Sequence, residues 1–475
     1  STPVNEQYNC KNLSDRGIGY GIESLTLDGN NVIEVYSKIK EIRKKIIKKP
    51  QPFLIEFKTF RMRGHEEASG VKYVPKELLE KWSKKDPVLN FEAFLIDSSI
   101  LTVEDVTKIK KGITKEIDTN LEKTFNEKKI ISSVENELSD VYADFNFKKV
   151  EKSNEVQNMR LVDSISDGLK EAMYKNDSLI IMGQDIAEYG GVFKITEGFV
   201  DLFGKDRVRN TPICESSIIE IAMGLSICNR KSIVELQFSD FITSGFNPVV
   251  NYLAKSHYRW GQNADIVLRM PCGAGVGAGP FHSQTNEAWF TKTPGLIVVY
   301  PSTPIDAKGL LISSVENPNP VLFFEHKALY RSIRDDVPKG YYNIEIGKAK
   351  LLNVGTDITI ITYGSGVHES IETIKKHSLS ADLIDLRTLS PLDNDSIIQS
   401  VRKTGKAIIL QEDSLFGGLA SEISSIIMEN CFENLDAPVI RVGSLDTPIP
   451  FEETLEKQYL PFERFESEIL KLIDY

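Results

Sequence analysis

Three side chains in this sequence have the type and the setting for acid–base chemistry: one glutamate and two histidines. Glu215 stands just before the apolar segment 218–227, where a carboxylate can move protons or complement a helix dipole. His282 follows a loop with glycine at every second position, and His65 lies in the dense polar loop 61–67. These residues are the candidates for chemistry, and the surrounding elements must position them.

The glycine-dense loop follows a predicted strand at 265–269 and consists of alternate glycines at Gly273, Gly275, Gly277 and Gly279. A dinucleotide fingerprint requires G-x-G-x-x-G, but its third glycine falls on Ala278, which excludes a Rossmann interpretation. Such a loop lets the backbone approach another group closely. His282 therefore stands at the carboxyl end of a strand, where open α/β sheets bind ligands, and both a functional and a structural role stay open for it.

Simpler interpretations stand beside the other candidates. Spacing alone favours Glu215 as a first-turn partner of the helix dipole, and the charges around His65 alone indicate a solvated surface. The remaining histidines carry no local signal and are predicted to be structural: His257, His326, His368 and His377. The sequence contains no G-x-S-x-G elbow, no P-loop and no H-E-x-x-H, so we predict no metal ligands in it.

Composition excludes several classes of protein. The 475 residues, at about 150 residues per domain, correspond to roughly three domains. Their net charge of -11 gives no electrostatic footprint for nucleic acid or an anionic membrane. The apolar runs are too short to span a bilayer, and no signal peptide is visible. Five cysteines without a C-x-x-C pair indicate a reducing compartment, and we predict a cytoplasmic protein.

Strands alternating with helices indicate parallel sheets covered on both faces. Strands are predicted at 179–183, 232–237, 265–269, 296–300 and 321–324, and a second set at 357–362, 381–385, 407–410 and 439–442. The N-terminal part predicts a helix at 32–47, a strand at 53–57 and a long amphipathic helix from 103. The fold class is therefore α/β, with two sheet units in tandem behind a shorter α/β part.

Several motifs occur in order along most of the chain. They are Glu188–Phe193, Thr211–Glu215, Glu235–Phe241, His282–Gln284, Pro294–Leu296, Ala307–Leu311 and Leu386–Asp393. From about residue 159 to the end, the sequence resembles the β subunit of the thiamine-diphosphate-dependent component of 2-oxoacid dehydrogenase complexes. Residues 1–140 resemble the C-terminal part of the matching α subunit through Ser1–Gln7, Leu27–Asn30, Thr59–Arg61 and Gly64–His65. The details look closest to the branched-chain type, and pyruvate-type enzymes share much of them.

The resemblance implies a transketolase-like architecture. A partial α-subunit remnant comes first, then a parallel-sheet pyrimidine-binding domain and a transketolase C-terminal domain. The expected bounds are 1–140 for the α part, 141–157 for a charged linker, 158–340 for the pyrimidine-binding domain and 345–475 for the C-terminal domain.

The resemblance also implies roles for the candidates. Glu215 would hold N1′ of the aminopyrimidine ring of thiamine diphosphate and drive its proton chemistry. Phe241 would lie against that ring, with Ile213 and Gln237 lining the same pocket. His282 would act near the reacting carbon. His65 would contribute to cofactor binding and serve acyl transfer to a lipoyl group.

Two departures from the family are visible. The Gly-Asp-Gly…Asn-Asn motif, through which relatives bind Mg²⁺ and the diphosphate, is absent from the sequence, so the Mg²⁺ ligands are expected in an N-terminal segment that precedes this one. The chain would then be a fragment. Glu66 occupies the place of a serine that a kinase phosphorylates in mammalian relatives, so that regulation is not expected. Relatives bind K⁺ near positions matching Ser314, Asn317 and Asn319, and the changed side chains leave a K⁺ site open.

The sequence therefore predicts a thiamine-dependent enzyme that decarboxylates a 2-oxo acid and passes the acyl group to the lipoyl group of a dihydrolipoyl acyltransferase. Its expected partners are that acyltransferase core, the 2-oxo acid, and a second copy in a dimer of α–β units. Two alternatives stay open. One is a transketolase or deoxyxylulose-phosphate synthase, which shares two of the domains. The other is a catalytically incomplete module that only docks on the acyltransferase core.

Overall fold

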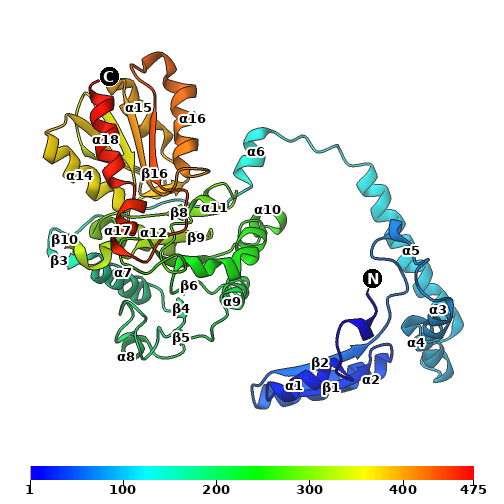
Figure 1. The fold of residues 1–475 in the computed structure, drawn as a ribbon. Coiled ribbons are helices and arrows are strands. Elements are labelled where there is room, and N and C mark those ends of the chain that lie inside the picture. Colours follow the sequence, from blue (N-terminus) through cyan, green and yellow to red (C-terminus); the bar gives the residue numbers. More distant parts are fainter. Residues whose placement is uncertain (1) are drawn as a thin grey trace. The chain divides into compact units, whose positions relative to one another are not determined.

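The computed structural model describes residues 2–475, apart from the side chain of Glu67. Ser1, the first residue of the Ser1–Gln7 motif, lies outside the described residues. The chain divides into two compact units, Ser1–Ile131 and Ser132–Tyr475 (Figure 1). Among the described residues, no helix combines the length and the apolar character needed to cross a membrane.

The first unit contains a pair of parallel strands, β1 (Glu23–Asp28) and β2 (Phe53–Lys58), connected by α2 (Val32–Lys48). Asn31 caps α2 by accepting the Glu34 N–H through its side chain. The predicted helices and strand of this part are confirmed, including α5 (Val103–Phe125), which begins at a Thr102 capping box. Its other helices are η1 (Val4–Glu6), η2 (Leu13–Asp15), α1 (Arg16–Gly19), η3 (Glu67–Ser69), α3 (Lys76–Ser83) and α4 (Pro87–Asp97).

The second unit contains a seven-stranded sheet with the order β14-β8-β9-β7-β6-β4-β5. All its pairs are parallel except the edge pair of β14 with β8. Each strand predicted in this region is present. The strands are β4 (Ile180–Gly183), β5 (Val208–Asn210), β6 (Ser232–Glu235), β7 (Ile266–Cys272), β8 (Ile297–Val299), β9 (Val321–His326) and β14 (Thr388–Ser390).

Helices cover both faces of this sheet. Consecutive residues of each strand face opposite ways, so they pack against different helices. Ile233 of β6 packs in a cluster with α7 (Leu161–Lys175) and α12 (Pro304–Glu316). Val234 packs on the other face with α9 (Glu215–Ile227). The shorter helices of the region are α6 (Val134–Ser139), α8 (Phe199–Phe203), η4 (Ser239–Gly245), η5 (Pro248–Leu253), α10 (Ser256–Trp260), α11 (Ala288–Thr291) and α13 (Leu329–Ser332).

A five-stranded sheet follows, with the order β11-β13-β12-β15-β16. Ile360 of β12 packs in a cluster with α14 and α18, while its neighbour Ile361 packs in a cluster with α15 and α16. The elements are β11 (Lys350–Asn353), β12 (Ile358–Thr362), α14 (Ser365–His377), β13 (Ala381–Asp385), α15 (Asn394–Thr404), β15 (Ala407–Ser414), α16 (Leu419–Cys431), η6 (Phe432–Asn434), β16 (Ile440–Ser444), α17 (Glu453–Tyr459) and α18 (Phe462–Ile473).

The strands that the sequence did not predict lack a continuous apolar run. β3 (Val156–Arg160) and β10 (Arg334–Pro338) form an antiparallel pair of largely polar residues. β5 and β14 have three residues each, and β11 is an edge strand. The charged segment between α6 and β3 contains no helix or strand, and it belongs to the second unit.

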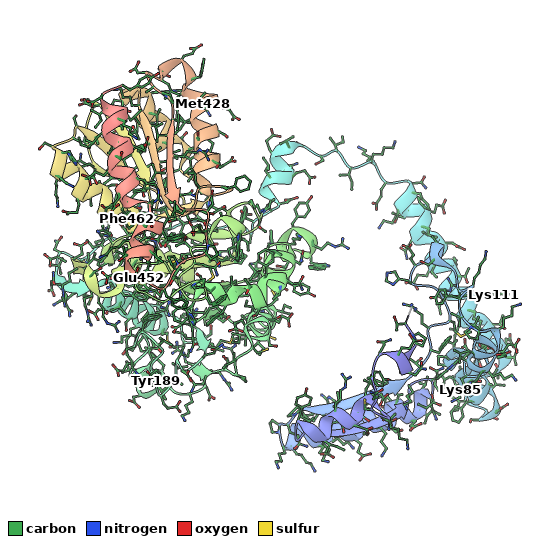
Figure 2. All side chains as sticks on the ribbon, in the orientation of Figure 1. Lys85, Lys111, Tyr189, Met428, Glu452 and Phe462 are labelled. Carbon is green, nitrogen blue, oxygen red and sulfur yellow. The ribbon has the colours of Figure 1, made fainter. Side chains whose placement is uncertain are left out.

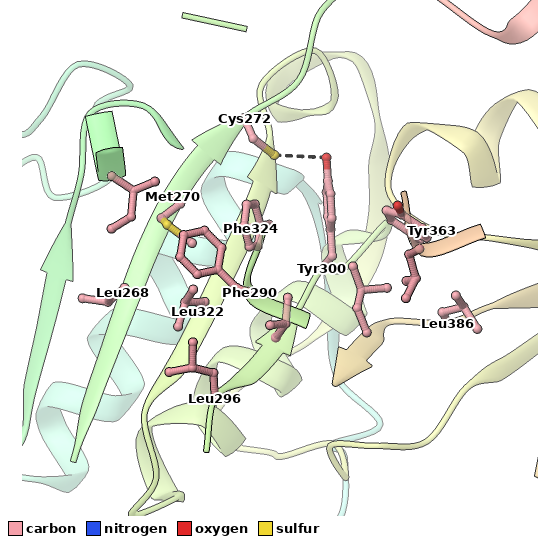
Figure 3. Close-up of a cluster of buried hydrophobic side chains, with 14 of the residues drawn as sticks. Leu268, Met270, Cys272, Phe290, Leu296, Tyr300, Leu322, Phe324, Tyr363 and Leu386 are labelled. Atoms are coloured by element: carbon pink, nitrogen blue, oxygen red, sulfur yellow. Dashed lines mark hydrogen bonds between the residues drawn. The ribbon is translucent and has the colours of Figure 1, made fainter. Parts of the chain in front are cut away.

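One apolar core joins the two sheets of the second unit. Tyr300 follows β8, and it packs against Phe324 of β9 and against Tyr363, which follows β12. The Cys272 thiol donates to the Tyr300 hydroxyl at 3.0 Å (Figure 3). The cluster that contains these residues is continuous from the first sheet to the second.

Candidate functional site

The carboxyl ends of six strands lie at one edge of the seven-stranded sheet, because β4, β5, β6, β7, β8 and β9 are parallel. Gln184 and Lys327 directly follow the ends of β4 and β9. Gln237 comes shortly after the end of β6, and Glu215 and His282 lie further along the segments that follow β5 and β7. The chain runs from β4 outward to β5 and then returns to β6 on the other side of β4. Such a reversal of strand order is where open α/β sheets bind ligands.

Glu215 is the first residue of α9, as its helix-dipole interpretation requires, and it is also buried, with 8% of its surface exposed. Gln184 Nε2 donates to Glu215 Oε1 at 3.1 Å and orients the carboxylate. The backbone of η4 packs closely against the first turns of α9. A Cβ added at Gly245 would lie 2.5 Å from Ile219 and 3.5 Å from the Glu215 carbonyl. The helix-dipole interpretation alone does not explain why Glu215 is buried beside the polar side chain of Gln184.

His282 is half-buried between two aromatic rings. Its imidazole lies edge-on to Phe238 at 4.9 Å between ring centroids, and to Phe241 at 5.5 Å. Lys327 lies 5.7 Å from the centre of the Phe238 ring, and its ammonium donates to the Gly273 carbonyl. Burial lowers the pKa of Lys327. The imidazole therefore lies against two aromatic rings, one of which also faces the Lys327 ammonium.

Three hydrogen bonds tie the segment after β6 to the segment that carries His282. Ser239 Oγ donates to the Gln284 carbonyl, Asp240 Oδ1 accepts the Gln284 N–H, and Asn286 Nδ2 donates to the Ser239 carbonyl. Asp240 Oδ2 is buried with no partner in the described part of the chain, and burial raises the pKa of this carboxyl. These bonds set the position of Phe241 relative to His282.

A buried ionic cluster lies on the neighbouring strands. Arg269 of β7 is fully buried, and it forms a bidentate ion pair with Glu325 of β9 and a second ion pair with Glu235 of β6. The Tyr330 hydroxyl donates to Glu325. Although burial disfavours its charge, the two carboxylates raise the pKa of Arg269. Arg269 stays charged, and it holds together the three strands that lead to the site.

The structure brings Glu215, Gln237, Phe241 and His282 to the same edge of the sheet. Gln237 and Phe241 are half-buried, but the side chain of Ile213 is 83% exposed. Among the described residues, the Ile213 side chain is therefore open to solvent. His65 belongs to the first unit, where it is exposed between β2 and η3.

Sequence reasoning missed several residues at this edge: Gln184, Phe238, Asp240 and Lys327. Each follows the carboxyl end of a predicted strand, and that position was the available signal. His326, predicted to be structural, is buried at the end of β9, and its Nε2 lies 2.6 Å from Glu412 Oε2. That contact joins residues 86 positions apart in the chain.

A buried carboxyl, that of Glu287, and a half-buried one, that of Asp413, predict a pH dependence of stability. Glu287 Oε1 accepts the Tyr363 hydroxyl, while Oε2 has no partner in the described part of the chain. Burial and the Asp413 carboxylate raise the pKa of Glu287 to about 8, and burial raises that of Asp413 to about 6. The folded state then binds more protons than the unfolded state, whose glutamate has a pKa near 4.5. The free energy of unfolding therefore falls as pH rises from about 4.5 to 8.

The variant Glu287→Gln keeps an acceptor for Tyr363 and removes the titrating group, so we expect it to flatten this decline. Urea unfolding at pH 5, 6.5 and 8 measures the change. Glu433→Gln, at an exposed glutamate of η6, is the matched control and should leave the slope unchanged. An equal decline in wild type and Glu287→Gln would contradict the assignment.

Three family models match successive parts of the chain. They are described as dehydrogenase E1 component over residues 1–132, transketolase pyrimidine binding domain over 157–332, and transketolase C-terminal domain over 347–464.

Similar proteins include β subunits of 2-oxoacid dehydrogenases. The chain is 43% identical over 328 residues to the mitochondrial 2-oxoisovalerate dehydrogenase subunit beta of Dictyostelium discoideum, a match that covers 67% of this chain and 88% of that protein. It is 41% identical over 308 residues to the pyruvate dehydrogenase E1 component subunit beta of Bacillus subtilis, a match that covers 64% of this chain and 94% of that one.

A solved structure described as a split gene transketolase, inactive beta4 tetramer, has a similar fold. It matches with a TM-score of 0.54 and 20% identity, over 66% of this chain and 98% of that one. The predicted transketolase-like α/β architecture is confirmed by this likeness and by the matched domains.

Proposed function

Because the chain belongs to the E1 family of 2-oxoacid dehydrogenases, enzymes whose domains imply thiamine diphosphate, we propose that it decarboxylates pyruvate or a branched-chain 2-oxo acid. We further propose that it passes the acyl group to the lipoyl group of a dihydrolipoyl acyltransferase. One observation carries the proposal: a buried glutamate, oriented by Gln184, shares a sheet edge with a histidine set between two aromatic rings.

The residues at this edge fit the aminopyrimidine half of thiamine diphosphate. Glu215 supplies a carboxylate for the N1′ nitrogen, and Phe241 a flat apolar surface for the ring. Thr211 Oγ1, close before Glu215 in the chain, is buried without a partner in the described residues and is available to a ligand. Gln237 and Ile213 complete this assignment. When bound, the cofactor would supply a carbon nucleophile for the 2-oxo carbonyl and a cationic ring that accepts the electron pair left when carbon dioxide departs.

In this proposal the protein's own residues hold and move protons. The Glu215 carboxylate shares a proton with N1′, and Gln184 keeps Oε1 oriented toward the sheet edge. His282 donates or accepts a proton near the 2-oxo carbonyl of the substrate. The Phe238 and Phe241 rings shield part of the His282 imidazole from water, which strengthens its interaction with a charged substrate.

These residues fit the pyrimidine half of the cofactor. They do not fit its diphosphate half or the Mg²⁺ bound there. The described residues contain no group of three His, Cys, Asp or Glu side chains that could hold a metal ion. The proposal for this chain concerns the pyrimidine half. Mg²⁺ would be bound with the diphosphate by a Gly-Asp-Gly…Asn-Asn segment of the kind that relatives have.

Other assignments rest on family membership. His65 is proposed to contact the cofactor and to serve acyl transfer to the lipoyl group, and the active assembly is proposed to be a dimer of α–β units. The proposed divisions of the chain are an α-type part at 1–140, a linker at 141–157, a pyrimidine-binding domain at 158–340 and a C-terminal domain at 345–475.

Calorimetric titration with thiamine diphosphate and Mg²⁺ tests the proposal, on this chain and on a form preceded by a Gly-Asp-Gly…Asn-Asn segment. We expect binding by the longer form, its loss in Glu215→Ala, and release of carbon dioxide from 2-oxo acids. Binding by neither form would overturn the proposal and favour the docking module. Turnover of sugar phosphates instead of 2-oxo acids would favour a transketolase.

A further inference from the structure

We propose that Glu456 and Glu412, which belong to the C-terminal part of the chain, position His282 by holding the glycine loop Gly273–Gly279 that precedes it. The inference deepens the proposed function, because it names residues that place the proposed acid–base histidine without touching substrate or cofactor. Both carboxylates are buried, with 4% and 7% of their residues' surfaces exposed.

Glu456 lies on α17, a helix whose residues fall in the sequence between Glu452 and Phe462, both labelled in Figure 2. Its Oε1 accepts the Gly275 N–H at 2.9 Å, and its Oε2 accepts the Gly277 N–H at 3.0 Å. Hydrogen bonds from backbone N–H groups to a carboxylate are among the stronger ones in proteins. One side chain thus holds two alternate residues of the loop.

Glu412 of β15 holds the start of the same loop. Its Oε1 accepts the Ala274 N–H at 2.7 Å, while its Oε2 contacts His326 Nε2 and accepts the Ser365 hydroxyl. Burial opposes its charge, but His326 and these hydrogen bonds leave the pKa of Glu412 below its ordinary value. Glu412 is therefore a carboxylate that is itself held from two further elements.

The loop has a backbone that requires this support. Its four glycines have φ angles of 93°, 83°, 67° and 69°, a region that other residues rarely adopt. With positive φ at alternate residues, the Gly275 and Gly277 N–H groups both turn toward the Glu456 carboxylate. Ala274 packs with Ile449, Tyr459 and Leu460, and a Cβ at Gly279 would lie 2.3 Å from the Phe451 ring. The C-terminal segment 449–460 therefore determines the path of a loop that glycine would otherwise leave free.

His282 follows this loop by three residues, and its N–H contacts the Gly279 carbonyl at 3.4 Å. On its other side, Gln284 is bound to Ser239 and Asp240. His282 thus stands between two anchors, one made by the carboxylates and one by the segment after β6. Loss of the first anchor leaves the imidazole free to move relative to the Phe238 and Phe241 rings.

The test compares Glu456→Ala and Glu456→Gln with Glu453→Ala, whose side chain is 79% exposed on the same helix. Hydrogen exchange of peptides covering 273–282 should accelerate about tenfold or more in Glu456→Ala. It should accelerate less in Glu456→Gln, whose amide oxygen still accepts, and stay unchanged in Glu453→Ala. If Glu456→Ala does not fold, Glu456→Gln decides the result.

The same variants are examined by proton NMR of the six histidine rings, with His282 assigned by the signal that His282→Asn removes. We expect the chemical shift of His282 to move in the Glu456 variants only. Unchanged exchange, or faster exchange with an unmoved His282 signal, would overturn the inference.

Kinetics separates this inference from the proposed function. In an active wild type, Glu456→Ala should lower kcat by about tenfold to a hundredfold with KM for the 2-oxo acid nearly unchanged, since a misplaced acid–base group affects the chemical step. Full kcat in this variant would overturn the positioning role. A wild type without turnover would refute the proposed function, while exchange and the His282 signal would still decide whether the carboxylates position the histidine.

Discussion

Turnover of a 2-oxo acid should fall by about 10²- to 10⁴-fold when Glu215 is replaced by glutamine, because a positioned acid–base group contributes that much. Glutamine has the same shape and still accepts the hydrogen bond that Gln184 donates at 3.1 Å. It cannot take or release the proton at N1′. The loss should therefore appear in turnover at saturating cofactor, while the fold is kept.

The helix-dipole interpretation of Glu215 predicts a different outcome. A first-turn carboxylate stabilises a helix by about 0.3–1 kcal/mol, so Glu215→Gln would lower stability slightly and leave turnover intact. Decarboxylation rate and urea unfolding, measured on the same preparation, distinguish the two interpretations. Glu220→Gln, an exposed glutamate on the same helix, is the control and should change neither quantity. Turnover within a factor of two of wild type would contradict the catalytic assignment.

The strands that could be predicted most directly from the sequence are those with continuous apolar runs. The segments 296–300 and 321–324 predicted strands because a strand buried on both faces has no polar side, and the structure places β8 and β9 there. The pair of β3 and β10 was missed because its residues are polar, and its pairing joins segments that lie far apart in the chain.

The candidate site likewise has residues that the sequence predicts and contacts that it does not predict. Glu215 and His282 could be found because each follows a predicted strand or opens a helix, but their partners could not. The bond from Gln184 to Glu215 spans 31 positions, and the bond from Gly277 to Glu456 spans 179. Neither spacing has a local signature, because tertiary packing alone brings these residues together. The ordered motifs indicated roles for Glu215 and His282, and the structure shows which residues contact them.

Replacing Arg269 by methionine should destabilise the protein by about 3–5 kcal/mol, the usual cost of removing one partner from a buried ion pair. Arg269 is fully buried, and its replacement would leave the carboxylates of Glu235 and Glu325 buried without a cation. Methionine fills similar volume, so the loss reflects uncompensated charge more than a cavity. Urea unfolding at pH 7 measures it, and Arg209→Met, at an exposed position on β5, is the control.

The deficit of Arg269→Met should also depend on pH. Burial already raises the pKa of Glu235 in the wild type, and without the guanidinium it rises further, so the folded variant binds protons that the unfolded chain has released. Its stability then falls as pH rises above about 4.5, and the deficit is smaller at pH 5 than at pH 8. Adding Glu235→Gln and Glu325→Gln to Arg269→Met should recover most of the loss, because no uncompensated charge remains. A deficit that is independent of pH and survives in the triple variant would mean that Arg269 contributes packing, and that the strands leading to Gln237 and His282 are not held by charge.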